Sequence, residues 1–318
     1  MPDTFLNAYD AKALFQDIES LVEMISCVTG ERRLQTALTL RSENKQLGST
    51  VWNELKVRGI APYRWSDELL TFYRETTAFL FESLVWNRSS QKQAMQRWIA
   101  GYLQQRFGRA CRILIYGDGL GFDSAALTML GHEVTYLEVS RKAIAFSRQL
   151  FDKLGCNVRM LDDPESIEGG YFDAVVCLDV LEHVPNPVDL VQSIYRCMRK
   201  DGCLIVHAPF WYLAKSVGTH LASNRRYSGA VHSLYGKCGM RAVNASWFWA
   251  PLVLTQEIAA EKMTKSAAIR FATGGVLLGL ARFWSTPHSY VAQLVLNRSL
   301  AKWPELDSLI KILEHSDR

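Results

Sequence analysis

The feature that most constrains the fold of this chain is a change of hydrophobic pattern at about residue 111. From there to residue 207, short apolar runs alternate with segments whose apolar residues recur at helical spacing. This alternation is typical of parallel strands joined by crossover helices, because each helix covers one face of the sheet. The pattern therefore predicts an α/β fold with a doubly wound, Rossmann-like sheet. The expected strands are residues 111–116, 134–139, 172–178 and 203–207, and the expected helices are 122–130, 140–154 and 188–198.

The 108 residues before this pattern show helical spacing and no strand signal. Ser66, followed by two acidic residues, has the features of a helix N-cap. It is expected to start an aromatic-rich helix that runs through Trp86, and residues 91–107 are expected to form another helix. We therefore expect residues 1–108 to form an N-terminal helical cap that shapes a substrate pocket.

The rest of the chain is expected to form the α/β domain over residues 109–298 and a C-terminal helical tail over residues 299–318. Within the domain, a strand at residues 241–248 is expected to pair with one at residues 290–296. A helical insertion at about residues 255–286 would separate these two strands. The most apolar stretch lies in this insertion, but Arg270 and Arg282 interrupt it, so no membrane span is expected.

The composition indicates the expected location of the protein and the kinds of partner that it is expected to lack. Seven cysteines are scattered through the chain without a CxxC pair or a Cys/His zinc spacing. This usage predicts reduced thiols, a cytoplasmic location and no metal site. A net charge of +4 is too small to indicate an extended track for phosphates, so a nucleic-acid partner is not expected.

A glycine-rich loop follows the first expected strand. Gly117, Gly119 and Gly121 alternate with other residues, which allows a sharp turn and a close approach to a ligand. A dinucleotide fingerprint requires a further glycine where Phe122 stands, so the loop fits a nucleoside without phosphates better than a pyrophosphate. Glu138 ends the next strand, where a carboxylate can accept hydrogen bonds from ribose hydroxyls in either class of enzyme.

A second polar group is expected at the same edge of the sheet. The run after the strand at residues 172–178 places Asp179, Glu182 and His183 at the carboxyl edge, where doubly wound folds bind ligands. His220 follows the strand at residues 203–207. An imidazole titrates near neutrality, so His183 and His220 are candidate general bases.

Several of these motifs occur in an order that resembles one family. They are the GxGxG loop, GHEVTYLEVS, the LDD at residues 161–163, YFDAVVCLDVLEHVPNP and MRKDGCLIVHAPF. Over about residues 110–250 the chain resembles a class I S-adenosylmethionine-dependent methyltransferase. It is most similar to the small-molecule branch with an LEHVPNP-type segment, to which ubiquinone-pathway enzymes belong.

The resemblance implies S-adenosylmethionine as the cofactor and a role for each matching residue. The loop glycines would surround its methionine and ribose parts, Glu138 would bind the ribose, Asp162 or Asp163 would bind the adenine amino group, and Leu178 and Asp179 would lie beside it. The family usually carries an Asp two residues before the first loop glycine, where this chain has Ile115. Asp118, inside the loop, is the candidate substitute for that carboxylate near the methionine ammonium.

The function expected from this reading is methyl transfer to a small-molecule acceptor, with oxygen favoured as the methylated atom. Phe210, Trp211 and Tyr212 follow a strand and are expected to form an aromatic wall of the acceptor pocket. Two alternatives stay open. Ile115 and the large helical region also fit a cofactor-binding or partner protein without activity, and an NAD-dependent oxidoreductase is disfavoured by Phe122.

Overall fold

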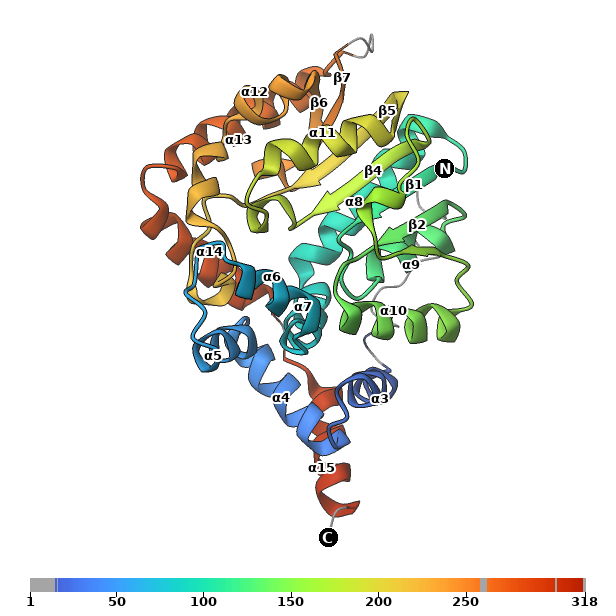
Figure 1. Ribbon diagram of the computed structural model, residues 1–318, viewed down its shortest axis with the longest axis vertical. Coiled ribbons are helices and arrows are strands. Elements are labelled where there is room, and N and C mark those ends of the chain that lie inside the picture. The colour runs from blue at the N-terminus through green and yellow to red at the C-terminus, as the bar shows by residue number, and fades with distance from the viewer. Residues whose placement is uncertain (1–14, 16, 258–261, 301, 317–318) are drawn as a thin grey trace.

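The computed structural model describes residues 15, 17–257, 262–300 and 302–316, and they form a seven-stranded sheet in the order β3-β2-β1-β4-β5-β7-β6 (Figure 1). Strands β1 to β5 are parallel, whereas β7 is antiparallel to both β5 and β6. The predicted doubly wound α/β fold is confirmed. The strands are β1 Arg112–Tyr116, β2 Glu133–Leu137, β3 Arg159–Leu161, β4 Phe172–Leu178, β5 Met198–His207, β6 Met240–Ala245 and β7 Leu252–Gln256.

Alternate residues of the central strands point into two different cores. Val175 of β4 packs in one core with residues of α11 (Pro187–Cys197) and α12 (Val231–Leu234). Val176 packs in the other core with residues of α8 (Ser90–Phe107) and α9 (Phe122–Met129). The whole of β4 is buried, which explains why its sequence is an unbroken apolar run rather than an alternating one.

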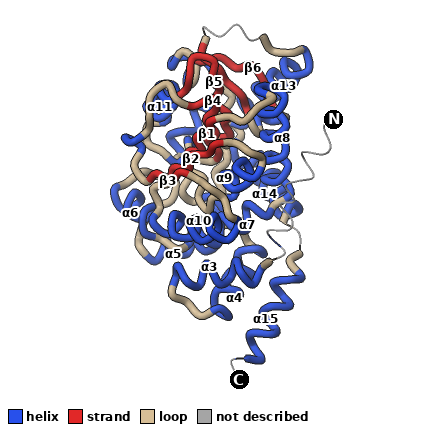
Figure 2. The backbone as a smooth tube through the Cα atoms, turned by 90° about the vertical axis from the view of Figure 1, so that its right-hand side faces the viewer, coloured by secondary structure: helices blue, strands red, loops and turns tan. Residues whose placement is uncertain are grey.

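Helices α3 to α7 and the last helix, α15, lie together below the sheet in the view of Figure 1, whereas α8 lies beside the strands. Residues from α3, α4 and α7 share one hydrophobic cluster with residues of α10 and α15. Figure 2 shows the last helix, α15, alongside the N-terminal helices, far from the strands. The bounds are α3 Ile18–Thr29, α4 Arg33–Lys45, α5 Ser49–Val57, α6 Asp67–Glu75, α7 Ala78–Arg88, α10 Arg141–Leu154 and α15 Pro304–Ser316. The first fourteen residues of the expected cap lie outside the described residues.

The aromatic-rich helix predicted from Ser66 through Trp86 is two helices rather than one. Ser66 does cap α6, since its hydroxyl accepts a hydrogen bond from Leu69 N at 3.2 Å. The chain then leaves the helix at Thr76, which adopts an extended conformation, donates its hydroxyl to Glu54 and accepts Ala78 N. A threonine that bonds its neighbours in this way competes with helical hydrogen bonding, so α7 starts in a new direction.

The prediction of a strand at residues 290–296 is wrong. These residues belong to α14 (Ser285–Ser299), and β6 pairs instead with β7 through a short connection. The apolar residues Val291, Leu294 and Val295 fit a helical repeat of three and four as well as a strand. The helices α13 (Lys265–Ala281) and α14 follow the β6–β7 hairpin instead of interrupting it. None of the described helices is long and apolar enough to cross a membrane.

Candidate active site

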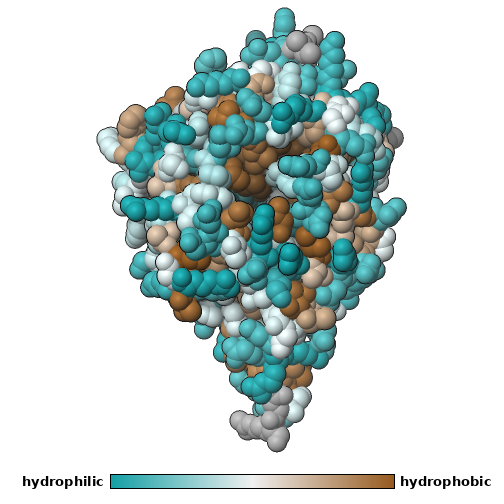
Figure 3. All heavy atoms as spheres, in the orientation of Figure 1, coloured by the Kyte–Doolittle hydropathy of each residue, from teal (hydrophilic) through white to brown (hydrophobic). Residues whose placement is uncertain are grey.

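A cavity of about 930 Å³ opens where the parallel strands end. Its walls come from the loops after β1, β2, β4 and β5, from α6 and α7, and from α13 and α14. Most of the lining side chains are apolar or aromatic, and Trp65, Phe79, Leu277 and Val291 are examples. On the face seen in Figure 3, apolar residues gather in a hollow near the centre. The sequence-predicted residues that line the cavity are Gly117, Gly119, Glu138, Asp179, His183, Trp211, Tyr212 and His220.

The glycine loop and the end of β2 are held together by Glu138. Its carboxylate accepts hydrogen bonds from Gly119 N at 2.9 Å, Val139 N at 2.7 Å and Ser140 N at 2.9 Å. Burial raises the pKa of this carboxyl, against the effect of the three N–H groups. Gly117 has φ 73°, and a Cβ there would lie 2.6 Å from Val180 Cγ2. Glycine is therefore required at this position both by the backbone and by the space.

Asp118 does not face the cavity. Its carboxylate accepts hydrogen bonds from Asp123 N at 3.2 Å and Ser124 N at 2.7 Å, in the first turn of α9. Burial, together with the neighbouring Asp123, raises the pKa of Asp118 to about 8. Ile115 stands where the family usually has an Asp, and its side chain is buried among apolar side chains. Asp118 thus stabilises the start of a helix, and the structure gives no support to its expected role beside an ammonium group.

Five further predicted residues also lie away from the cavity lining. Gly121 packs against Phe151, and Phe210 is buried in the core beside Tyr227. Asp162 and Asp163 are exposed after β3, and the Asp163 side chain caps the following turn by accepting Glu165 N. Leu178 is buried in the sheet.

Asp179 links the end of β4 to the cap. Its carboxylate accepts hydrogen bonds from His207 Nδ1 at 2.6 Å and from Trp86 Nε1 at 3.1 Å. Burial opposes ionisation of this carboxyl, but His207, Lys92 and Trp86 outweigh it and lower its pKa. Asp179 also has a left-handed backbone, with φ 57°. The side chain of the residue after β4 is therefore fixed from both the sheet and the helical cap.

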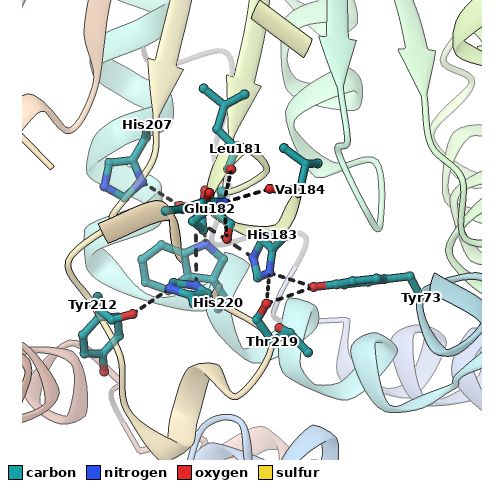
Figure 4. A network of polar contacts seen from close by, with 12 residues as sticks. Tyr73, Leu181, Glu182, His183, Val184, His207, Tyr212, Thr219 and His220 are labelled. Atoms are coloured by element: carbon teal, nitrogen blue, oxygen red, sulfur yellow. Dashed lines mark hydrogen bonds and ion pairs between the residues drawn. The ribbon is translucent and has the colours of Figure 1, made fainter. Parts of the chain in front are cut away.

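Next to Asp179, the side chains of Glu182, His183 and His220 meet (Figure 4). One ligand atom from each of the three lies within 4.8 Å of the others. Glu182 Oε1 is 4.0 Å from His183 Nε2 and 3.8 Å from His220 Nε2. The two imidazole rings stand edge to face, with centroids 4.7 Å apart. Both histidines line the cavity, whereas Glu182 is not one of its lining residues.

The outer nitrogens of both rings are engaged by neighbours. His220 Nδ1 lies 2.8 Å from the carbonyl oxygen of Tyr212, and His183 Nδ1 lies 2.9 Å from the hydroxyl of Tyr73. Burial lowers the pKa of His183 to about 4 and holds the pKa of His220 well below its usual value. Both rings are therefore neutral near pH 7.

Sequence reasoning placed His183 and His220 at this edge but missed the residues that hold them. Tyr73 and Trp86 come from the cap and are separated from their partners by about a third of the chain. Their only sequence signal is the aromatic clustering before residue 87. Glu182 stood in a recognised motif, yet the pattern gave no role to it. The metal-ligand spacing was also missed, because the three side chains come from two segments.

Comparison with known proteins bears on the segment that builds this edge. A family model described as a methyltransferase domain matches residues 114–206, which include the glycine loop, Glu138 and the Asp179–His183 segment. Residues 114–206 are therefore similar in sequence to a methyltransferase domain. The predicted resemblance to class I S-adenosylmethionine-dependent methyltransferases is thereby confirmed for this part of the chain.

Curated relatives are similar over about a third of the chain. The chain is 28% identical over 110 residues to the ubiquinone biosynthesis O-methyltransferase of Xanthomonas oryzae pv. oryzae, covering 33% of this chain and 46% of that one. It is 29% identical over 133 residues to the protein of that name from Pseudomonas aeruginosa, covering 38% and 57%. The match thus spans about half the length of these relatives.

Solved structures with partial likeness include a magnesium protoporphyrin IX methyltransferase from Synechocystis, with 18% identity and a TM-score of 0.41 over 52% of this chain and 79% of that one. Another is a 1,6-didemethyltoxoflavin-N1-methyltransferase from Burkholderia thailandensis, with 17% identity and a TM-score of 0.41 over 59% and 83%. These likenesses are distant.

Proposed function

We propose that this protein transfers a methyl group from S-adenosylmethionine to a hydroxyl group of a bulky, largely apolar small molecule. The observation that carries the proposal is that one cavity joins two different kinds of site. One part of its lining, the glycine end, consists of Gly117, Gly119 and Glu138, and another part, the acceptor end, includes the neutral imidazoles of His183 and His220. A transferase needs such an arrangement, because donor and acceptor must be aligned in one enclosed space.

The residues present fit a nucleoside cofactor at the glycine end. Gly119 lines the cavity, and a Cβ there would meet nothing closer than Ser83 Oγ at 3.7 Å, so the loop leaves room for a ligand. The Glu138 carboxylate has capacity for a further donor beyond the three N–H groups that it already accepts. When bound, S-adenosylmethionine supplies a methyl group on a sulfonium sulfur. The protein's task is then to bind, orient and exclude water.

The acceptor end favours an apolar molecule with a hydroxyl group. Its walls include Tyr73 and Phe79 from the cap and Trp211 from the segment after β5. His183 and His220 are neutral at pH 7, so each is able to take up or share the hydroxyl proton without first losing one of its own. A neutral amine would need no such group, which is why oxygen is preferred over nitrogen in this proposal.

The cofactor part of the proposal is tested by calorimetry with S-adenosylmethionine, S-adenosylhomocysteine and NAD. We expect binding of the first two and not of NAD. Glu138→Gln should weaken S-adenosylmethionine binding by about 10-fold to 100-fold, because a charge-assisted acceptor is lost. Glu133→Gln is the matched control, since Glu133 lies at the other end of β2 and is exposed. Binding of NAD alone would support an oxidoreductase instead.

The transfer itself is tested by single-turnover assays with labelled cofactor and a panel of hydroxylated aromatic and isoprenoid compounds. His183→Asn and His220→Asn should each slow transfer by about 10²-fold to 10⁴-fold while cofactor affinity stays unchanged. His315→Asn, on the exposed surface of α15, is the control. Cofactor binding without transfer to any member of the panel would favour the inactive cofactor-binding alternative.

A further inference from the structure

Helices α13 and α14, with the three residues 282–284 between them, carry most of the exposed apolar side chains of the described residues. Ten of the seventeen large apolar side chains that are exposed lie between residues 269 and 295. We call these ten side chains the α13–α14 patch, which lies on the left side of the molecule in Figure 1. Soluble monomers rarely expose large apolar patches, so a patch of this kind indicates a surface that binds a partner.

The exposed apolar residues share one face of each helix. On α13, Ile269, Val276 and Leu280 are seven and four residues apart, so they form a single stripe. On α14, Tyr290 and Leu294 are four residues apart and also share a face. Each helix is therefore amphipathic, with an apolar stripe that points to solvent rather than to the core.

The opposite faces of the two helices are fixed to the α/β domain. The Ser228 hydroxyl donates to the carbonyl oxygen of Leu278 on α13 at 2.8 Å. On α14, the side-chain oxygen Oε1 of Gln293 accepts the Tyr212 hydroxyl at 2.8 Å. Both helices are thus held by their inner faces, and folding of this chain does not cover the α13–α14 patch.

The charge of this segment narrows the kind of partner. Residues 262–300 contain five lysines and arginines and no aspartate or glutamate. Two copies of the segment facing each other would bring like charges together, which opposes self-association through the patch. An apolar face with basic residues beside it matches instead the surface of a bilayer with anionic headgroups. Four of the five cations are exposed, namely Lys262, Lys265, Arg282 and Arg298.

We infer that α13 and α14 dock on the surface of a lipid bilayer that contains anionic lipids. Phe283 and Trp284, between the two helices, are 75% and 67% exposed. Aromatic side chains of this kind favour the boundary between headgroups and acyl chains. None of the described helices can cross a membrane, so both helices lie on the bilayer surface. They also lie outside residues 114–206, so the docking belongs to this chain and not to the matched domain.

The cavity gives this docking a consequence, which rests on the proposed function. Leu277, Val291 and Val295 line the cavity and are also exposed, so the cavity reaches the surface at the α13–α14 patch. Phe248 combines the same two properties. A bilayer seated on the patch covers this opening, and an apolar acceptor enters the cavity from the lipid. Entry by this route avoids the cost of exposing the acceptor to water.

The experiment measures cosedimentation of the full-length protein with vesicles, without cofactor or acceptor. One set of vesicles is phosphatidylcholine alone, and the other contains equal parts of phosphatidylcholine and phosphatidylglycerol. We expect binding to the anionic set, weakened by added salt. The double substitution Phe283→Gln with Trp284→Gln should reduce partition by about 10-fold to 100-fold. Lys265→Gln and Arg282→Gln should each reduce it by about five-fold.

Matched controls come from exposed residues outside the patch. Ile312→Gln on α15 removes apolar surface, and Lys200→Gln on β5 removes a charge, and both should leave partition unchanged. Failure to bind anionic vesicles would overturn the inference and point to a protein partner instead. Binding that survives the double substitution would overturn it as well, because the lipid contact would then lie elsewhere.

Self-association is tested separately by analytical ultracentrifugation without vesicles. We expect the wild type and the double variant to sediment alike. A dimer of the wild type that the double substitution abolishes would overturn the inference, since the patch would then join two copies of the chain. None of these measurements depends on methyl transfer, so failure of the docking and failure of the proposed function are distinguishable. Circular dichroism checks that each variant is folded.

Discussion

A buried carboxyl group lies near each end of β4, and the two groups differ in their hydrogen-bond donors. At the amino end, Asp173 accepts the backbone N–H of Arg112 at 2.9 Å and the side chains of Arg109 at 3.1 Å and Arg199 at 2.9 Å. Beyond the carboxyl end, Glu182 has no donor among the described residues. The carboxylate of Asp173 is therefore fully paired with hydrogen-bond donors, whereas neither oxygen of Glu182 is paired.

This difference separates a carboxylate that is fully paired from one that has no hydrogen-bond donor among the described residues. Burial opposes ionisation of Asp173, but the Arg112 backbone N–H and the arginines outweigh it and lower the pKa of that carboxyl. Burial and the charge of Asp179 instead raise the pKa of Glu182 well above its usual value. A buried carboxyl group whose charged form is destabilised by its surroundings is a better indicator of a functional site than one whose charge is fully paired.

The largest effect on stability is expected from Asp173→Ala. Loss of the carboxylate leaves the buried Arg112 N–H without an acceptor and the three arginines without their shared partner, so the free energy of unfolding should fall by about 2–3 kcal/mol. Urea denaturation followed by circular dichroism measures it. Asp201→Ala, on an exposed turn, is the control and should change little.

The same comparison has a pH dependence with a definite sign. The pKa of Asp173 is lowered in the folded protein, so its contribution is complete above the unfolded pKa and is lost as the pH falls through the folded one. The gap in stability between the wild type and Asp173→Ala should therefore narrow in acid. A gap that stays constant from neutral pH to the acid limb would mean that Asp173 acts by packing rather than by charge.

A smaller effect is expected from alanine in two glycine turns, one at each edge of the sheet. Gly117, after β1, and Gly131, before β2, both have positive φ, so alanine should cost about 1 kcal/mol at either. Only at Gly117 would the new Cβ meet a neighbour, Val180, so Gly117→Ala should cost about 1 kcal/mol more. Equal losses in thermal unfolding would show that the carboxyl edge is not tightly packed there.

The smallest effect, and one of opposite sign, is expected from Glu182→Gln. An amide removes the cost of a buried carboxyl group that has no donor and offers two donors to the facing imidazole nitrogens, so the free energy of unfolding should stay the same or rise by up to about 1 kcal/mol. Chemical denaturation measures this. A clear loss of stability would show that Glu182 is structural, like Asp173, and would remove the contrast between the two ends.

The sequence predicted four of the five parallel strands because they are largely buried and read as apolar runs, as in residues 172–178. It missed β3, whose three residues are exposed or half-buried. It also placed Glu138 and His183 at the correct edge, since parallel strands end on one side. It did not predict that Asp118 caps α9, because the direction of a side chain in a glycine loop depends on backbone angles. It did not predict the contact between Tyr73 and His183 either, which depends on how the cap docks on the sheet.

The left-handed backbone of Asp179 has a consequence for which sequences can build this fold. With φ 57°, the position disfavours β-branched and bulky residues whatever their chemistry. Glycine would fit the backbone but leave His207 and Trp86 without their acceptor, whereas asparagine would keep both the conformation and one oxygen. Natural variants of this chain should therefore carry almost only Asp or Asn at position 179. Backbone geometry alone would restrict evolution at this position, even without selection for catalysis.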